Sequence, residues 1–140
     1  MSHEKIKRLF EVELNAFAAA QNPPLRVAYR NVKFTPKVGE TYLISDNLPA
    51  VTDSLTLGGD HTVYIGLYQI TIVTPLNVGT KVATDIAESL SQTFKLNKQY
   101  GSGGLVVQII KPLYIPEGDV EQTVHTLPTH FKYRCDTDGS

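Results

Sequence analysis

The sequence predicts an α+β domain, in which a mainly antiparallel mixed sheet carries two helices packed on it. Two segments place apolar residues at helical spacing, and the runs between them are rich in β-branched and aromatic residues, the composition of strands. The predicted order is helix, two strands, a long connection, a strand, a helix and two closing strands. Because 140 residues is a usual length for one domain, we expect residues 1–140 to share a single core.

The first helix is predicted over Ser2–Ala20. Its apolar residues form one stripe, which would face the sheet: Ile6, Leu9, Phe10, Leu14, Phe17 and Ala18. The helix ends at Gln21-Asn22-Pro23-Pro24, because a residue that precedes proline is pushed out of the helical region.

Two strands and a long connection come next. We predict a strand over Leu25–Phe34, a turn over Thr35–Gly39 and a second, shorter strand over Thr41–Ser45. Asp46–Asp60 has little periodicity and is punctuated by proline, glycine and aspartate. The pattern therefore predicts either a long loop or a hairpin arm over residues 46–60.

The centre of the predicted fold is the strand Thr62–Val73 with the helix that follows it. This strand is apolar at odd and at even positions, which is typical of a central strand covered on both faces. Pro75 would close it. Asn77 and Thr80 are candidate N-caps of the next helix, whose apolar stripe is Val82, Ala83, Ile86, Ala87, Leu90 and Phe94.

The chain closes with two more strands. Asn97–Gly104 is predicted to be a glycine-rich turn and Leu105–Lys111 a buried strand. Thr123–Arg134 would be the last strand, in which Pro128 indicates a bulge or an edge position. Residues 135–140 are predicted to form a polar, flexible tail.

Composition narrows the functional classes. The chain has 41% hydrophobic and 19% charged residues, as ordinary globular proteins do, and its formal net charge of −1 gives no general attraction to nucleic acid or membrane. No apolar run reaches the roughly 18 residues of a membrane span, and no apolar segment of a signal peptide opens the chain. One cysteine excludes an internal disulfide. We expect a protein made in the cytoplasm that contacts no membrane.

No group of residues has the spacing of a catalytic, metal or cofactor site. The histidines form no i, i+4 pair on a helix: they are His3, His61, His125 and His130. Cys135 falls in the predicted tail, where nothing would orient a base, and Gly101–Gly104 precedes a strand instead of opening a helix. The aspartates of the long connection match no calcium loop and would form at most a weak or intersubunit cation site. We therefore expect no enzyme and no cofactor.

One stretch combines cations with aromatic residues. Its cations precede the first acidic residue of the segment, Glu40, and are Arg26, Arg30, Lys33 and Lys37. Tyr29 and Phe34 lie between them, which is typical of single-strand nucleic-acid binding. The slightly acidic chain as a whole favours a solvated face or a protein-binding patch instead.

The central strand and helix resemble a known family. The run Y-I-G-L-Y-Q-I-T-I-V-T-P-L-N-V-G-T, followed by an alanine-bearing helix that ends in S-Q-T-F, is similar to the phage tail terminators. These are also called tail completion or minor tail proteins of long non-contractile tails, and the phage lambda tail terminator is the best-known member. Phe34–Leu43 resembles the strand pair before the long loop of that family. The residues that match in the central unit are Gly66, Tyr68, Gln69, Pro75, Gly79, Ala87 and Phe94.

The resemblance implies a structural subunit that assembles as a ring, in the family a hexamer, on the end of the growing tail tube. There it would stop polymerisation and present a surface to the head-tail connector protein. The expected partners are therefore other copies of the chain, the tail-tube protein and the connector, and DNA in the ring lumen would make only transient, nonspecific contacts. The protein would end in the virion tail after assembly in the host cytoplasm.

The expected interface combines the basic stretch with the long connection. Opposite charges on two faces of one subunit would pair between neighbours and close a ring, so we expect the four cations to meet the acids of the connection or a tube protein. The connection contributes Asp46, Leu48, Asp53, Leu55, Leu57 and Asp60. We expect Leu48–Gly59 to be mobile in the monomer and ordered in the ring. The alternative function is a small nucleic-acid-binding module that uses residues 26–37.

Overall fold

A computed structural model describes residues 2–21, 24–29, 32–54, 62–76, 81–102, 105–116, 119–120 and 124–137. Within these residues the helices are α1 (Ser2–Ala19) and α2 (Lys81–Thr93). The strands are β1 (Arg26–Tyr29), β2 (Tyr42–Ser54), β3 (Thr62–Pro75), β4 (Gln99–Ser102), β5 (Leu105–Tyr114), β6 (Asp119–Val120) and β7 (Val124–Thr137).

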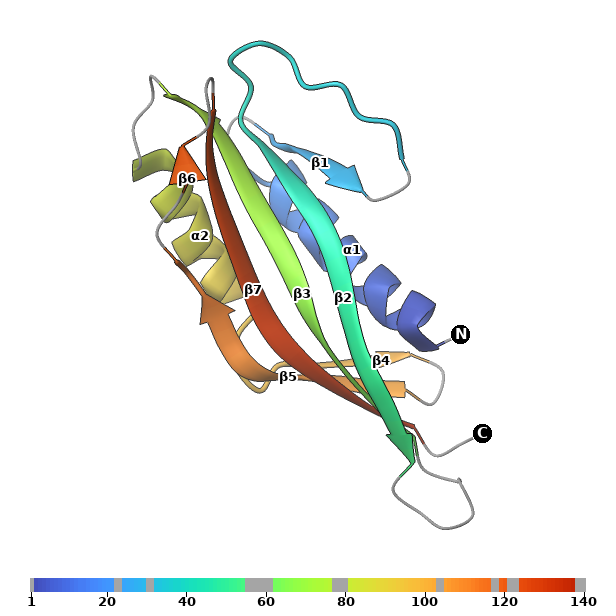
Figure 1. Ribbon diagram of the computed structural model, residues 1–140. Helices are drawn as coiled ribbons and strands as arrows, with labels where there is room; N and C mark the ends of the chain where they lie inside the picture. The colour runs from blue at the N-terminus through green and yellow to red at the C-terminus, as the bar shows by residue number, and fades with distance from the viewer. Residues whose placement is uncertain are drawn as a thin grey trace.

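The strands form one sheet, ordered β1-β2-β3-β7-β5-β4, with the short β6 beside the start of β7 (Figure 1). β1 runs parallel to β2, and every other pair is antiparallel. β3 and β7 lie at the centre and pair over their whole length, from Thr62↔Thr137 to Pro75↔Val124. The predicted α+β fold with a mainly antiparallel mixed sheet is confirmed.

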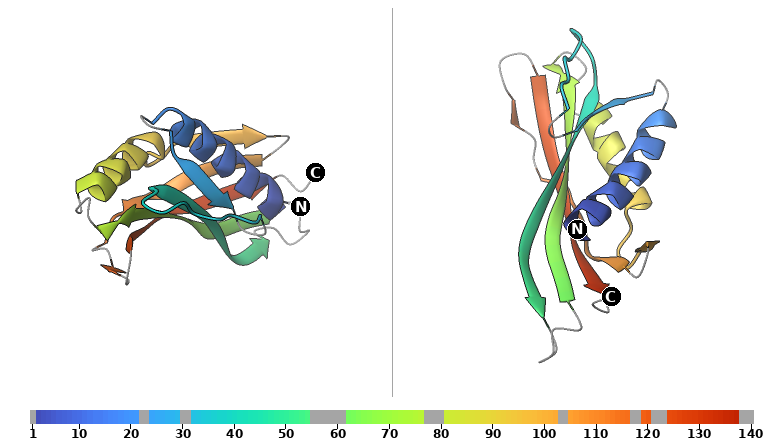
Figure 2. Two further views of the ribbon diagram at one scale, coloured as in Figure 1. Left: turned by 90° about the horizontal axis from the view of Figure 1, so that it is seen from above. Right: turned by 90° about the vertical axis from the view of Figure 1, so that its right-hand side faces the viewer.

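Both described helices lie on the same face of the sheet, which curls around them (Figure 2). The even positions of β3 face these helices, and Tyr68, Ile70 and Ile72 are fully buried there. The odd positions face the other side, which no helix covers in the described part of the chain, and Ile65 and Leu67 are only half-buried there. Val63 and Val73, also at odd positions, are buried, so the expectation that this strand is covered on both faces is wrong for its middle part only, and its central position is confirmed.

Aromatic rings fill the core between the helices and the sheet. Phe10 of α1 is the hub of this cluster, with ring centroids of five other residues 5.0–6.4 Å from its own: Tyr68, Phe94, Tyr100, Phe131 and Tyr133. The predicted stripe of α2 is buried at Ala83, Ile86, Ala87 and Leu90, whereas Val82 at its margin is exposed. Full burial of a side chain as large as leucine, isoleucine or phenylalanine stabilises the fold by about 1.5–3 kcal/mol relative to its exposure.

The strand predicted over Leu25–Phe34 is shorter than expected. β1 ends at Tyr29, and the Val32 amide donates to the Tyr29 carbonyl at 3.2 Å, which turns the chain. Phe34 packs its ring against Tyr42, with centroids 5.0 Å apart, instead of extending β1. Packing against a neighbouring ring therefore overrides the local strand propensity of this segment.

The second strand is much longer than predicted and takes in most of the long connection. β2 runs to Ser54 and pairs with β3 up to Ser54↔Thr62, with one irregularity between Pro49 and Thr52. Residues 46–54 are thus one strand of a hairpin arm and not a loop, while residues 55–60 lie outside the described part. Pairing with β3 holds residues 46–54 in a strand, although their own sequence lacks the alternation that is typical of a strand.

The glycine-rich segment after α2 is also a strand where a turn was predicted. Asn97 takes a left-handed backbone conformation with φ of 68° and its amide donates to the Ile109 carbonyl, so the chain reverses before β4 begins. β4 then pairs with β5 from Gln99↔Gln108 to Ser102↔Leu105. Lys98 ties this edge to the helices, because its ammonium donates to Glu13 of α1 and to the Thr93 carbonyl of α2.

The last strand extends beyond its predicted end. β7 continues to Thr137 and Cys135 is fully buried in the core, so the predicted flexible tail is wrong for residues 135–137, and residues 138–140 lie outside the described part. Pro128 lies in a central strand, not at an edge, opposite Thr71 of β3. On the other side of β7, the described part of β5 pairs with residues from Thr137 to His130, and β6 pairs with His125 and Thr126. Neither β5 nor β6 lies in register with Pro128, so its missing amide costs no hydrogen bond to these two strands.

Candidate interaction surfaces

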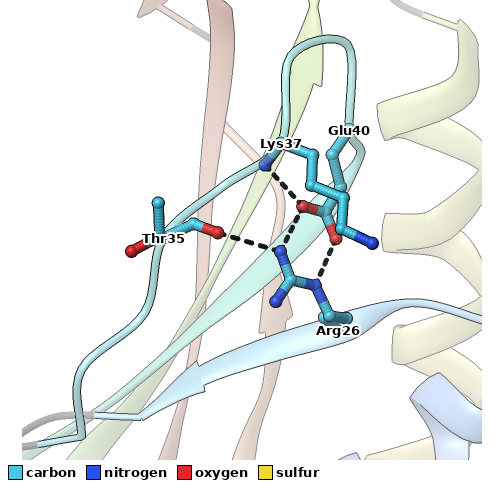
Figure 3. A network of polar contacts seen from close by, with 4 residues as sticks. All are labelled: Arg26, Thr35, Lys37 and Glu40. Carbon is cyan, nitrogen blue, oxygen red and sulfur yellow. Dashed lines mark hydrogen bonds and ion pairs between the residues drawn. The ribbon is translucent and has the colours of Figure 1, made fainter.

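The basic stretch is held by an ion pair within the subunit. Arg26 of β1 donates from Nε to Glu40 Oε2 and from Nη2 to Glu40 Oε1, both at 2.6 Å, and from Nη2 to the Thr35 carbonyl at 3.0 Å (Figure 3). The Lys37 amide donates to Glu40 Oε1 at 2.9 Å. The guanidinium also lies 4.5 Å from the centre of the Phe34 ring. These contacts clamp the connection between β1 and β2 onto the edge of the sheet.

The clamp perturbs the titration of Glu40. Hydrogen bonding to Arg26, helped by the Lys37 amide, lowers the pKa of the Glu40 carboxyl from 4.5 to about 2. Glu40 was not among the predicted interface residues. It is the first acid after the basic stretch, and that position is the sequence signal that identifies it. Arg26 is consequently engaged inside the subunit, and the basic stretch offers fewer free cations to a nucleic acid than its composition indicates.

The connection between β1 and β2 has an exposed turn at Val38 and Gly39, which we call the clamped tip. Val38 is fully exposed, and the side chains of Lys37, its neighbour in the chain, and of Lys33, earlier in the connection, are exposed as well. Gly39 adopts a φ of 76°, the left-handed conformation that favours glycine at such a turn. Between this tip and the ends of β3 and β7 lies a groove lined by Pro36, Lys37, Val38, Gly39, Glu40, Tyr42, Pro75 and Val124.

The structure places the other predicted interface residues as follows. Asp46 and Leu48 lie on the sheet face without helices, opposite Gln69 and Leu67 of β3, and Leu48 is exposed. Asp53 belongs to β2 beyond the irregularity, opposite Val63. The remaining predicted residues lie outside the described part of the chain: Arg30, Leu55, Leu57 and Asp60.

The predicted basic and acidic interface residues do not form one cluster within the subunit. Arg26 is opposite Tyr42, which lies four residues from Asp46 along β2, or roughly 13 Å at the rise of a strand. Arg26 also has Glu40 as its nearer partner. The predicted pairing of basic and acidic residues is not made within the described part of one subunit and stays a prediction about neighbouring subunits.

The sheet face without helices has an apolar half and a basic half. We call it the open face. β2 and β3 contribute half-buried or exposed apolar side chains to it, among them Ile44, Leu48, Ile65 and Leu67. β5 and β7 contribute Lys111, Tyr114, His130, Lys132 and Arg134. Sequence reasoning missed the second group, although its period-two spacing on β7 was a usable signal.

The described residues do not assemble reactive chemistry. Burial raises the pKa of the Cys135 thiol to about 11, so the thiol is protonated near neutral pH. His125 is buried on the core side of β7 and His130 lies on the open face, as their odd spacing predicts. Among the described residues, no group of three or more metal-ligating side chains comes together, and no helix is long and apolar enough to cross a membrane.

Comparison with known proteins identifies the family of the chain. The family model described as phage tail terminator protein matches residues 5–133. One solved structure is similar to this chain with a TM-score of 0.83 and 35% sequence identity, and the match covers 96% of each chain. No curated protein matches the chain.

Proposed function

The chain belongs to the phage tail terminator family, a family of structural tail proteins, and from this premise we propose that it caps the tail tube as a ring of identical subunits. The ring would end polymerisation of the tube and present the surface to which the head-tail connector binds. It would assemble in the host cytoplasm and remain in the virion tail. The family match over residues 5–133 is the observation that carries this proposal.

The surfaces of the subunit support a function by contact. Large apolar side chains are exposed at separate places, with Val38 at the clamped tip, Leu48 on the open face and Val12 on α1. A subunit inside a ring on a tube needs contacts with two neighbours and with the tube, so several separate contact surfaces are required. The described part of the chain offers such surfaces, and within it no group of three or more metal-ligating side chains comes together.

We assign the clamped tip to the contact with the tube protein or with the neighbouring subunit. Its shape is held by the bidentate pair of Arg26 and Glu40, and its free cations are Lys33 and Lys37. Electrostatic complementarity would steer docking onto an acidic rim, and Val38 would add apolar contact. The acids of the hairpin arm, Asp46 and Asp53, are the candidate partners on the next subunit.

Tube polymerisation observed by negative-stain electron microscopy tests the capping function. Purified tail-tube protein is polymerised with and without this protein. We expect short tubes that carry extra density at one end when the protein is present. Tubes of unchanged length with bare ends would contradict the capping function.

Charge reversal tests the role of the clamped tip in the same assay. The double variant Lys33→Glu/Lys37→Glu should cap tubes poorly and remain folded, because the reversed charges would repel the docking surface. The matched control is Lys5→Glu, an exposed lysine of α1. If the double variant caps tubes as the wild type does, the tip is not the docking surface.

A further inference from the structure

We infer that the basic half of the open face is a socket for a carboxylate-bearing helix of a second copy, namely the outward face of α2 around Glu88. This inference rests on the proposed ring. The socket is a groove of about 380 Å³ on β5 and β7. Its lining includes Leu67, Lys111, Pro112, Tyr114, His130 and Lys132.

Two irregularities in β5 build the socket. The register between β5 and β7 shifts between Ile109 and Lys111 and again between Lys111 and Tyr114. As a result Lys111 lies opposite Lys132, and Tyr114 lies opposite His130 with ring centroids 5.3 Å apart. Leu113, between the shifted residues, remains buried in the core. Such bulges re-aim side chains, and here they turn a lysine and a tyrosine onto the open face.

The resulting arrangement lacks a counter-charge within the subunit. Two lysines opposite each other on neighbouring strands repel. In the described part of the chain, neither Lys111 nor Lys132 forms an ion pair or a hydrogen bond. The floor of the groove is apolar, with Leu67 and Pro112, and Tyr114 is 57% exposed at its wall. A carboxylate with an apolar neighbour would complement these two lysines and the apolar lining together.

The outward face of α2 has that chemistry. Glu88 is exposed and forms no ion pair in the described part of the chain. Asp85 and Gln92 lie on the same helical face, one turn from Glu88 on either side, and Val82 at the margin of that face is exposed. Asp85 pairs with Lys81 at 3.0 Å, and Lys81 and Lys95 lie at the two ends of this face, so Glu88 is its one carboxylate that forms no ion pair within the described residues.

The two surfaces point in opposite directions. α2 packs on the helix-covered side of the sheet, and its outward face points away from the open face (Figure 2). A head-to-tail contact joins two different surfaces of one subunit, and repeated contacts of this kind close into a ring when the rotation permits. The helix-covered side of one copy would therefore meet the open face of the next.

A protein carboxylate fits the socket better than a nucleic acid does. The basic group is short, because beyond Lys132 the guanidinium of Arg134 is neutralised by Asp136 at 3.1 Å. On the other side of the socket, His130 lies opposite Gln69 of β3, and Gln69 lies opposite the acidic Asp46 of β2. A nucleic-acid site would need a longer track of cations.

Sedimentation velocity of the full chain, over rising concentration at low salt, tests the inference by charge exchange. We expect the wild type to self-associate, and Lys132→Glu and Glu88→Lys each to weaken the association about tenfold. The double variant Lys132→Glu/Glu88→Lys should recover most of the loss, because the opposite charges face each other again. Lys5→Glu on α1 is the matched control and should associate as the wild type does. Thermal unfolding would show that each variant is folded.

Several results would overturn the inference. A wild type that stays monomeric over the whole range excludes this contact, and so does a double variant that is weaker than either single one. Loss of binding to a duplex oligonucleotide in Lys132→Glu, with self-association unchanged, would reassign the socket to nucleic acid. Normal tube capping by Lys132→Glu counts against the socket alone, whereas absence of capping by the wild type counts against the proposed function.

Discussion

Gly66 of β3 is limited in size by the residue opposite it. A methyl group built on Gly66 would lie 2.5 Å from the hydroxyl oxygen of Tyr133 and 2.9 Å from the carbonyl oxygen of Leu48. The tyrosine cannot easily withdraw, because its ring is buried and its hydroxyl donates to Asn47 Oδ1 at 3.0 Å. Glycine is therefore required here to make room for a buried tyrosine.

We expect Gly66→Ala to lower the free energy of unfolding by about 1–3 kcal/mol, the usual cost of overpacking a core. Urea denaturation measures it. In the Tyr133→Phe background the same change should cost less, since the nearest clashing atom is gone, although the ring carbon at 2.8 Å remains. A Gly66→Ala variant as stable as the wild type would show that this close approach is absent in solution.

The pair of Arg26 and Glu40 makes the stability of the clamp depend on pH. The pKa of Glu40 in the folded protein, about 2, is below the ordinary value of 4.5. A carboxylate with a lowered folded pKa stabilises the fold above its unfolded pKa, and this contribution disappears as the pH falls through the folded pKa. Its contribution is therefore complete above pH 4.5 and is lost between pH 4.5 and pH 2.

Glu40→Gln should flatten the acid branch of the stability curve in that window. Because the pair lies at the surface, the change in the free energy of unfolding will be small, and the amide shift of Lys37 is the sharper reporter. In the wild type this shift should titrate with a midpoint near pH 2, since the amide donates to Glu40. Glu88→Gln is the control and should leave the midpoint unchanged. A Lys37 midpoint near 4.5 would mean that the clamp does not form.

At the scale of elements, β2 has a long edge that faces no described strand. β1 pairs with it only from Tyr42 to Ser45, and from Asp46 onwards the described part of the chain places a partner on the β3 side alone. Pro49 has no amide donor, and the register of β2 is irregular between Pro49 and Thr52. Features of this kind protect a free edge from uncontrolled pairing with other chains.

Hydrogen exchange distinguishes this strand from a mobile loop, which is one of the two alternatives that the sequence leaves open for residues 46–60. In the isolated subunit, the amides of residues 46–48 that donate to β3 should exchange slowly, whereas the alternate amides at the free edge should exchange fast. Slower exchange at the free edge after assembly would place that edge in an interface. Uniformly fast exchange over residues 46–54 would contradict the hairpin arm.

The elements that were predicted correctly carry their own periodic pattern. α1 and α2 contain enough apolar residues at one spacing for their buried faces to be identified from the sequence alone, and the run of β-branched and aromatic residues identifies β3 as a strand without showing which of its faces is buried. β2 beyond Ser45 and β4 do not, because each becomes a strand through pairing with a partner distant in the sequence. Cys135 shows the same limit, since a polar segment is held in the sheet by β3 and β5 on its two sides.

The candidate surfaces were predictable to a smaller extent. The basic stretch was visible as a run of cations, but its pairing with Glu40 depends on how the connection folds back. The socket depends on two register shifts in β5, without which Lys111 would not lie opposite Lys132. Such shifts are set by pairing across the sheet, and composition gives no sign of them.

At the scale of the whole molecule, the sheet divides the subunit into two unlike sides. The helices and the aromatic core occupy one side, and the open face with its apolar and basic halves occupies the other (Figure 2). Two unlike sides are what a head-to-tail ring requires, whereas a two-fold dimer would join like surfaces. This division connects the fold of one chain to the assembly proposed for it.

Electron cryo-microscopy of the tube ends tests this account most directly. The account predicts a closed ring of copies on the end of the tube, in which the α2 side of each subunit contacts the open face of the next. The clamped tip at Val38 should contact the tube or the neighbouring subunit. Tube ends without a ring, or copies that meet through two open faces, would contradict it.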